Sequence, residues 1–488
     1  MPIHGREASL TGGETSSTGC QLGSAWRMAP TITVPEPQPT AGVKRVSRVP
    51  SGHRSRPGGP LPDGPRLGAL AQGTWFHRDP VGMTERMQGT YGDLFTLRMP
   101  VEGSVVVVCA PEATGQLLAS DPSFAHAGEG RQRILGMVAK RSVLGADDVQ
   151  HRESRGRVRA VFERDAIHAH APAIAEITSA HVSSWPRGRP VRLLPLVRAL
   201  CDEIFARCVV GVRDAARAAE LGRLVQRMLW TPGNPPMSPP GTDDGVLGQL
   251  GKVVFARRAA PVRELLSDEL RLRRRFGDLE SNDLLGAMLR ADGLTDDERL
   301  DEILPLLMAG QEPPAAGLTW LLDRLARTPA LADEIVSSPT GERTDAIRRE
   351  TLRLTPAVAA IMRRLMAPTT VAGVELPGGT MTMLPIAWHH HDPRVWGADA
   401  SEFRPDRFLT PDGRSTSDHA TPGPLFPFGG GERRCLGEHL AHLEMDVVLP
   451  AVFRAVSVRP LWPSVERPVV RGTVLVPHRS TPVVLTAP

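Results

Sequence analysis

Lysine is almost absent from this chain. Only Lys44, Lys140 and Lys252 occur among 488 residues, so arginine supplies nearly all of the 58 basic side chains. We attribute this bias to the base composition of the genome before any function. The net charge of +4 is too small and too dispersed to indicate a nucleic-acid-binding protein, which gathers lysine and arginine on one face.

The chain also lacks a secretory cysteine framework, a long apolar run and the apolar core of a signal peptide. An odd number of cysteines without short spacings suits a reducing cytoplasm better than secretion. The five are Cys20, Cys109, Cys201, Cys208 and Cys435. No apolar run approaches the ~20 residues that cross a bilayer, and the N-terminal segment shows no signal sequence. We therefore expect a cytoplasmic protein without a membrane span.

The first 60 residues differ in composition from the rest. They are rich in Gly, Ser, Thr, Pro and Arg and have little apolar periodicity, which predicts a disordered extension. Whether translation starts at Met1 or Met28 stays open. Residues 61–488 read as one domain, mainly α-helical with a smaller β portion, an α+β fold.

A glycine-rich turn delivers one cysteine to a helix start. The three residues Gly429–Gly431 can take positive φ and lie close to a flat partner. Free N–H groups and the helix dipole then favour Cys435 as the metal-binding thiolate. Gly437 leaves room for a large ligand, and Arg433 can pair with a ligand carboxylate. A lone cysteine at such a place is usually a small buried hydrophobe, so the assignment depends on the whole pattern.

That pattern, Phe-x-x-Gly-x-Arg-x-Cys-x-Gly from Phe428 to Gly437, resembles the haem-binding loop of the cytochrome P-450 superfamily. The resemblance implies haem b (Fe-protoporphyrin IX) between a long central helix and the cysteine loop. Cys435 would be the axial ligand of the haem iron, with Phe428, Arg433 and Gly437 around the cofactor. Dioxygen would be the co-substrate, with electrons from NAD(P)H through redox partners.

Two further motifs occur in the order that the superfamily has them. Glu350 and Arg353 stand three apart on a predicted helix, so they share a face. Alone, this spacing fits a surface ion pair, which contributes little. With the later Phe-x-Pro-x-Arg-Phe run, the resemblance implies a buried network of Glu350, Arg353 and Arg407 that supports the fold and takes no part in catalysis.

Three sets of basic residues have competing interpretations. His151 and Arg155 share a helix face; a solvated charged face is one interpretation, and the resemblance implies contact with a haem propionate. Arg363 corresponds to another propionate-binding position, with Arg364 as its competitor. The run from His389 to His391 could bind a metal, but no second ligand cluster accompanies it, so we assign it a structural role.

The segment Asp296–Arg327 is predicted as one long helix, interrupted where the superfamily has Ala-Gly-x-acid-Thr. The resemblance implies that Gly310 opens a groove for dioxygen and that Glu312 helps to deliver protons. Pro313 stands in place of the threonine. Pro313 and Pro314 remove two backbone donors, so we expect a kink or a widened turn, with freed carbonyls that hold water.

The missing hydroxyl leaves three readings open. The enzyme hydroxylates its substrate without the threonine; the proton comes from a substrate hydroxyl or from Glu312 and ordered water; or the reaction needs no such relay, as in phenol coupling, ring closure or peroxide-driven oxidation. Thr319 lies too far along the helix to replace the missing group.

The resemblance implies a small-molecule substrate bound by several separate segments. Their apolar or small side chains favour a largely apolar, specialised metabolite. The segments are 124–137, the loop near Pro235, 306–312, 357–361 and 476–478. We expect a monomer that receives electrons from a ferredoxin and ferredoxin reductase, docked near Arg433 and Arg434. The alternatives are an atypical member that performs coupling, ring formation or peroxide-driven oxidation, and a haem-binding protein without turnover.

Overall fold

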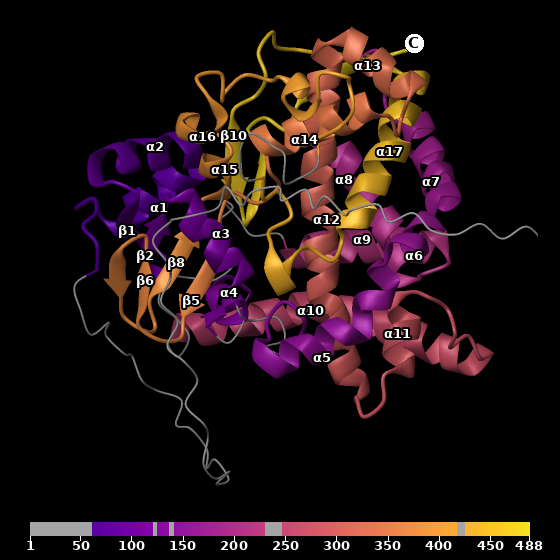
Figure 1. Ribbon diagram of the computed structural model, residues 1–488. Coiled ribbons are helices and arrows are strands. Elements are labelled where there is room, and N and C mark those ends of the chain that lie inside the picture. Colours follow the sequence, from indigo (N-terminus) through magenta and orange to yellow (C-terminus); the bar gives the residue numbers. More distant parts are fainter. Residues whose placement is uncertain (1–60, 121–123, 136–140, 230–245, 417–424) are drawn as a thin grey trace, which may run out of the picture. The chain divides into compact units, whose positions relative to one another are not determined.

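The computed structural model describes residues 61–120, 124–135, 141–229, 246–416 and 425–488 (Figure 1). The extension predicted to be disordered, residues 1–60, lies outside the described residues, as does the loop near Pro235. Within the described ranges, no helix is long and apolar enough to cross a membrane.

Helices make up most of the described chain, and this confirms the predicted fold class. The longer helices are α1 Ala69–Arg78, α2 Pro80–Tyr91, α3 Pro111–Ala119, α4 Ala127–Leu135, α5 Asp148–Arg159, α7 Ala171–Ser184, α8 Leu193–Ile204, α9 Ala215–Leu229, α10 Val246–Phe276, α12 Asp296–Arg327, α13 Pro329–Ser337, α14 Glu342–Leu354 and α17 Glu438–Ala455. Shorter turns are η1 Ala160–Phe162, α6 Arg164–His168, the π-helix η2 Phe205–Val210, α11 Leu284–Arg290, α15 Ile386–His389, α16 Pro393–Trp396, η3 Pro405–Phe408 and η5 Gly431–Arg433.

Twelve short strands form the β portion of the described residues. They are β1 Leu94–Met99, β2 Gly103–Val108, β3 Ala125–His126, β4 Pro190–Arg192, β5 Ile361–Leu365, β6 Thr369–Val371, β7 Val374–Leu376, β8 Met381–Leu384, β9 Ser457–Pro460, β10 Pro468–Arg471, β11 Val474–Pro477 and β12 Pro482–Thr486. The largest sheet has the order β1-β2-β8-β5-β3. The β-branched run of β2 is buried between β1 and β8, as expected for a central strand.

Helix α12 is the axis of the largest apolar core, and Figure 1 shows it beside α8 and α17. It begins with a capping box, in which the Thr295 hydroxyl accepts from the Glu298 N–H while the Glu298 carboxylate accepts from the Thr295 N–H. The helix then continues without a break through Pro313 and Pro314. The predicted interruption is therefore wrong, because packing on both sides holds the helix, although the two proline donors are still missing.

The predicted network around Glu350 is present and buried. Arg353 donates to both Glu350 oxygens at 2.7 and 2.9 Å, and Arg407 Nε donates to Oε1 at 3.1 Å. The backbone N–H of Arg404 donates to the same oxygen at 2.9 Å. Glu350 and Arg353 have no exposed side-chain surface. The network joins α14 to η3, which precedes the cysteine loop.

The histidine run is structural, as predicted. His389 Nε2 lies 2.8 Å from Thr114 Oγ1 and 3.1 Å from the Val108 carbonyl. His390 Nε2 accepts from the Phe426 N–H at 2.9 Å, and so ties the start of the cysteine loop to the β region. No group of metal-binding side chains was found within the described ranges.

These buried histidines predict that acid destabilises the fold. Burial lowers the pKa of His389 and of His391 to about 4, whereas an unfolded histidine titrates near ~6.5. The unfolded chain therefore binds more protons, and stability falls as the pH drops from ~6.5 towards 4, by ~1.4 kcal/mol per pH unit for each group. Denaturant unfolding across this range measures the slope. His389→Gln should make it shallower, and an unchanged slope would contradict the assignment.

Candidate active site

Two of the three glycines in the cysteine loop have the positive φ that the sequence predicts. Gly429 has φ +72° and Gly431 φ +63°, whereas Gly430 is extended with φ −161°. The prediction of positive φ was therefore wrong for Gly430. A Cβ on Gly431 would lie 2.4 Å from the Leu118 carbonyl oxygen, so this glycine seats the loop against the end of α3 and does not face a flat ligand.

Cys435 lies just before α17, as the sequence predicts. Its N–H donates to the Phe428 carbonyl at 2.9 Å, which closes the loop. The residue is accessible, yet protein surrounds the thiol closely enough that burial raises its pKa, while the Gly437 N–H acts in the opposite direction. A bound metal cation reverses that balance, because a coordinating thiol is deprotonated. A Cβ on Gly437 would meet only Cys435 Sγ, at 3.9 Å, among the described residues, so the predicted room is present.

A short stretch of α12 is accessible although its neighbours are not. Residues 302–308 and 315–323 are buried, whereas Ala309 is exposed and Gly310, Glu312, Pro313 and Pro314 are half-buried. A Cβ on Gly317 would lie 3.4 Å from Met445 Cε of α17. The accessible stretch precedes this contact on α12, and Cys435 precedes it in the segment that leads into α17. We conclude that they line one internal space.

Five basic side chains gather around the same space. They are Arg131, His151, Arg155, Arg363 and Arg433. Burial, followed by the charges of Arg433, Arg155 and Arg131, lowers the pKa of His151 to about 4. Burial, followed by Arg131 and Arg433, lowers the pKa of Arg363 to about 9. Arg131 and Arg155 both lie in the field of the Cys435 thiol.

These groups fit a haem. Asp147 is the carboxylate that acts most strongly on the cluster, so positive charge is buried without full compensation, which favours binding of an anion. His151 Nδ1 and Arg433 Nε are buried and have no hydrogen-bond partner within the described residues. Haem propionates supply such acceptors, and Cys435 supplies the thiolate ligand that haem iron takes.

Two predicted residues also contact the protein itself. Arg155 Nη2 donates to the Arg434 carbonyl at 2.9 Å, and so braces the cysteine loop. Arg433 donates to Asp147 Oδ1 at 2.5 Å and to the Ala146 carbonyl at 2.6 Å. Only 6% of the Arg433 side chain is exposed, so its predicted place in a surface docking patch is wrong. Asp147 is held in turn by the first N–H groups of α4.

The sequence did not reveal the role of Arg131 or the close contact between Gly310 and Phe205. Arg131 belongs to no motif, and the one local signal is the glycine pair of α4. A Cβ on Gly128 would lie 2.4 Å from the Gly145 carbonyl, and one on Gly130 would lie 3.1 Å from Met362, so these glycines bring α4 close to the site. A Cβ on Gly310 would lie 2.2 Å from the Phe205 ring.

The space beside Gly310 is thus filled by a side chain. The predicted dioxygen groove therefore does not lie on the Cβ side of Gly310, and this glycine lets η2 pack against α12. Phe205 begins the π-helix η2, an insertion that is often found near functional sites. Pro313 contributes no hydroxyl, and the Thr319 hydroxyl donates to the Ala315 carbonyl at 2.6 Å, so Thr319 is occupied as well as distant.

Two of the predicted substrate segments, 357–361 and 476–478, come together at β11. The 357–361 segment is held next to β11, since the Leu475 N–H donates to the Ala357 carbonyl at 2.8 Å and the Trp320 indole donates to the Leu475 carbonyl at 3.0 Å.

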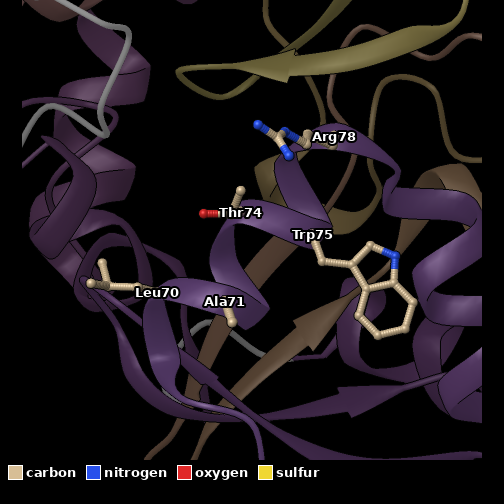
Figure 2. Close-up of a pocket in the computed structure, with 5 residues that line it drawn as sticks. All are labelled: Leu70, Ala71, Thr74, Trp75 and Arg78. Atoms are coloured by element: carbon tan, nitrogen blue, oxygen red, sulfur yellow. The ribbon is translucent and has the colours of Figure 1, made fainter.

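A separate surface depression of about 420 Å³ lies on α1 (Figure 2). Its lining residues are Leu70, Ala71, Thr74, Trp75 and Arg78. We assign it no role.

An accessible cysteine, a buried cationic cluster and the accessible stretch of a central helix fit a haem-thiolate protein. Comparison with known proteins names the family. The family model described as cytochrome P450 matches residues 57–337 and 342–483, so the chain belongs to the cytochrome P450 family. It is an oxidoreductase of the monooxygenase type, which uses haem b, dioxygen and electrons from NAD(P)H delivered by redox partners.

Individual relatives cover most of the chain. Cytochrome P450 135B1 of Mycobacterium tuberculosis is 34% identical over 434 residues, which are 86% of this chain and 90% of that protein. Cytochrome P450 135A1 of the same organism is 33% identical over 430 residues, which are 86% of this chain and 93% of that protein. Among solved structures, the cyanobacterial CYP120A1 with bound retinoic acid has a TM-score of 0.74 at 22% identity, with 88% and 100% covered; it shares the fold.

Proposed function

We propose that residues 61–488 form one catalytic domain that oxidises a small, largely apolar organic molecule of specialised metabolism. Electrons come from NAD(P)H through a ferredoxin and its reductase, and the protein works as a cytoplasmic monomer. The observation that carries the proposal is the accessible stretch 309–314 in the middle of a buried helix, on the space shared with Cys435. Its surface is made of small and apolar groups beside one carboxylate, Glu312.

The chain's own residues divide the work. Cys435 would hold the haem iron, Arg363 and Arg131 would neutralise the propionates, and the uncharged His151 ring would hydrogen-bond to one of them. When bound, haem activates dioxygen and supplies the oxidising power. Residues 309–314 orient the substrate and keep bulk water out, and the carbonyls left free by the two prolines hold ordered water. Glu312 then provides the proton path that the hydroxyl at position 313 would have provided.

Arg363 should help to retain haem, and its neighbour gives a matched control. Arg363 is 3% exposed, whereas Arg364 pairs with Glu129 at 3.2 Å and is 36% exposed. Arg363→Gln should weaken haem binding on the order of tenfold, because a hydrogen bond to a charged group contributes ~1.5–3 kcal/mol. The rate of haem transfer to apomyoglobin measures this. Equal rates for Arg363→Gln and Arg364→Gln would refute the assignment.

The substrate class can be tested by optical titration of the ferric protein. A bound organic molecule displaces the water on the iron and shifts the spectrum from low spin to high spin. Fractions of an extract from the host organism are the probe, and the proposal expects an apolar fraction to produce the shift. A shift produced by polar fractions alone would refute the apolar substrate class.

A second function is favoured by the absent relay hydroxyl. Pro313 has none, and Thr319 donates its own to Ala315. Hydrogen peroxide already carries the two electrons that the redox partners would supply and the two protons that the relay would deliver, so oxidation driven by peroxide needs no threonine. Turnover with hydrogen peroxide that exceeds turnover with ferredoxin and reductase would favour this alternative, or one of oxidative coupling and ring formation.

A further inference from the structure

Two residues of α8, Arg198 and Asp202, lie behind the acidic residue of α12. Arg198 and Asp202 are four positions apart, so they share a helix face. Arg198 Nη2 donates to Glu312 Oε2 at 2.7 Å. Asp202 lies under α9, where a Cβ on Gly222 would be 3.0 Å from its Cβ. The Gln226 amide of α9 donates to its two oxygens at 3.4 and 3.2 Å.

Asp202 lies in surroundings that favour its protonated form. It is 7% exposed. Burial raises its pKa to about 8, and the charge of Glu312 acts in the same direction. Arg198 and Gln226 act against this rise without cancelling it. At neutral pH Asp202 is therefore a buried acid that holds its proton.

Two other titratable groups near the pair cannot serve as proton donors. Burial raises the pKa of the Cys201 thiol well above its usual value, so this thiol does not release its proton. Arg471 of β10 lies in the fields of Arg198 and Glu312, and a guanidinium keeps its proton in proteins. Asp202, by contrast, is a buried acid that interacts with Glu312 and is able to give a proton.

We propose that Asp202 stores the proton that Glu312 passes towards the haem, in place of the hydroxyl missing at position 313. The inference rests on the proposed role of Glu312. No hydrogen bond joins the two carboxyl groups directly, so the proton passes from Asp202 to the Glu312 carboxylate through water. Water beside the half-buried Gln226 returns a proton to Asp202, and Arg198 stabilises the negative charge. Asp202 acts through Glu312 and is a positioning residue.

The first test needs no turnover. Infrared difference spectra of the haem-loaded protein, titrated through pH about 8, report the carbonyl stretch of protonated carboxyl groups. Glu444 is the matched control, because burial also raises its pKa to about 8. It lies on α17, and the Cys201 thiol donates to its Oε2 at 3.9 Å. Asp202→Asn should remove one titrating band and Glu444→Gln the other.

The second test measures proton delivery in the absence of a substrate, from the ratio of superoxide to hydrogen peroxide that the enzyme releases. Dioxygen that takes one electron from reduced ferredoxin leaves as superoxide and needs no proton, whereas two electrons and two protons give hydrogen peroxide. Asp202→Asn should raise the ratio of trapped superoxide to peroxide roughly tenfold at neutral pH. In the wild type the ratio should rise as the pH passes about 8, and the variant should lose this dependence. Glu444→Gln should leave both unchanged.

The outcomes separate the possibilities. Equal ratios in Asp202→Asn and Glu444→Gln would overturn the relay, and so would a single titrating band that Glu444→Gln abolishes. That second result needs no Asp202 variant, so it decides the matter even if Asp202→Asn does not fold. Failure of the wild type to consume dioxygen with reduced ferredoxin would refute the proposed function itself, whatever the infrared bands show.

Discussion

Replacement of Cys435 by serine should abolish the thiolate spectrum of the ferrous–CO complex and all monooxygenase turnover. A hydroxyl is a far weaker donor to iron than a thiolate, whose donation favours cleavage of the O–O bond. The fold should survive, because the loop is closed by backbone groups, including the Cys435 N–H, which serine retains. Absorption spectra of the reduced, CO-treated protein measure the loss.

Cys109→Ser is the control for this substitution. Cys109 is a free, buried cysteine just after β2 and takes no part in the site. Its variant should keep the thiolate spectrum, even if some stability is lost. A thiolate spectrum in Cys435→Ser would show that another cysteine holds the iron, and would remove the basis of the site as a whole.

The residues that sequence could identify are those with fixed spacing along one segment. Cys435 and its loop, and the pair Glu350 and Arg353, are each set within a few residues, so local geometry carries the prediction. Arg407 lies more than fifty positions from Glu350, yet a second motif marks it, and the structure joins them at 3.1 Å. The order of the motifs along the chain was therefore enough to predict this contact, although the packing was not known.

The predictions were wrong where a residue's surroundings depend on a helix or loop that packs against it from elsewhere in the chain. Nothing local says that Phe205 fills the space at Gly310 or that Asp147 draws Arg433 inward. The prolines of α12 offered a strong local signal for a break, but helix packing overrode it. Arg131 carried no signal, because its role comes from the close approach of α4 to β5. Tertiary contact therefore decides the surroundings of Gly310 and the charge balance around Arg433.

Removal of the Glu350 carboxylate should prevent stable folding and haem incorporation. In Glu350→Ala the guanidinium groups of Arg353 and Arg407 lose their shared partner inside the protein, where the Glu350 and Arg353 side chains are fully buried. An uncompensated buried charge costs ~3–5 kcal/mol, a large part of the ~5–15 kcal/mol that keeps a protein folded. Denaturant unfolding and the haem content of the purified protein measure the effect.

The matched control removes a carboxylate from an exposed arginine. Asp412 pairs with Arg414 Nε at 2.7 Å, but their side chains are 56% and 77% exposed, so water replaces the lost partner and stability should not change measurably. Glu350→Gln removes the charge and one of the two acceptor oxygens but keeps the other, so its loss should be intermediate. If Glu350→Ala were as stable as Asp412→Ala, the network could not be what holds the cysteine loop in place. The 3-10 turn at Arg407 would then have to be positioned by Phe408 packing against Trp396.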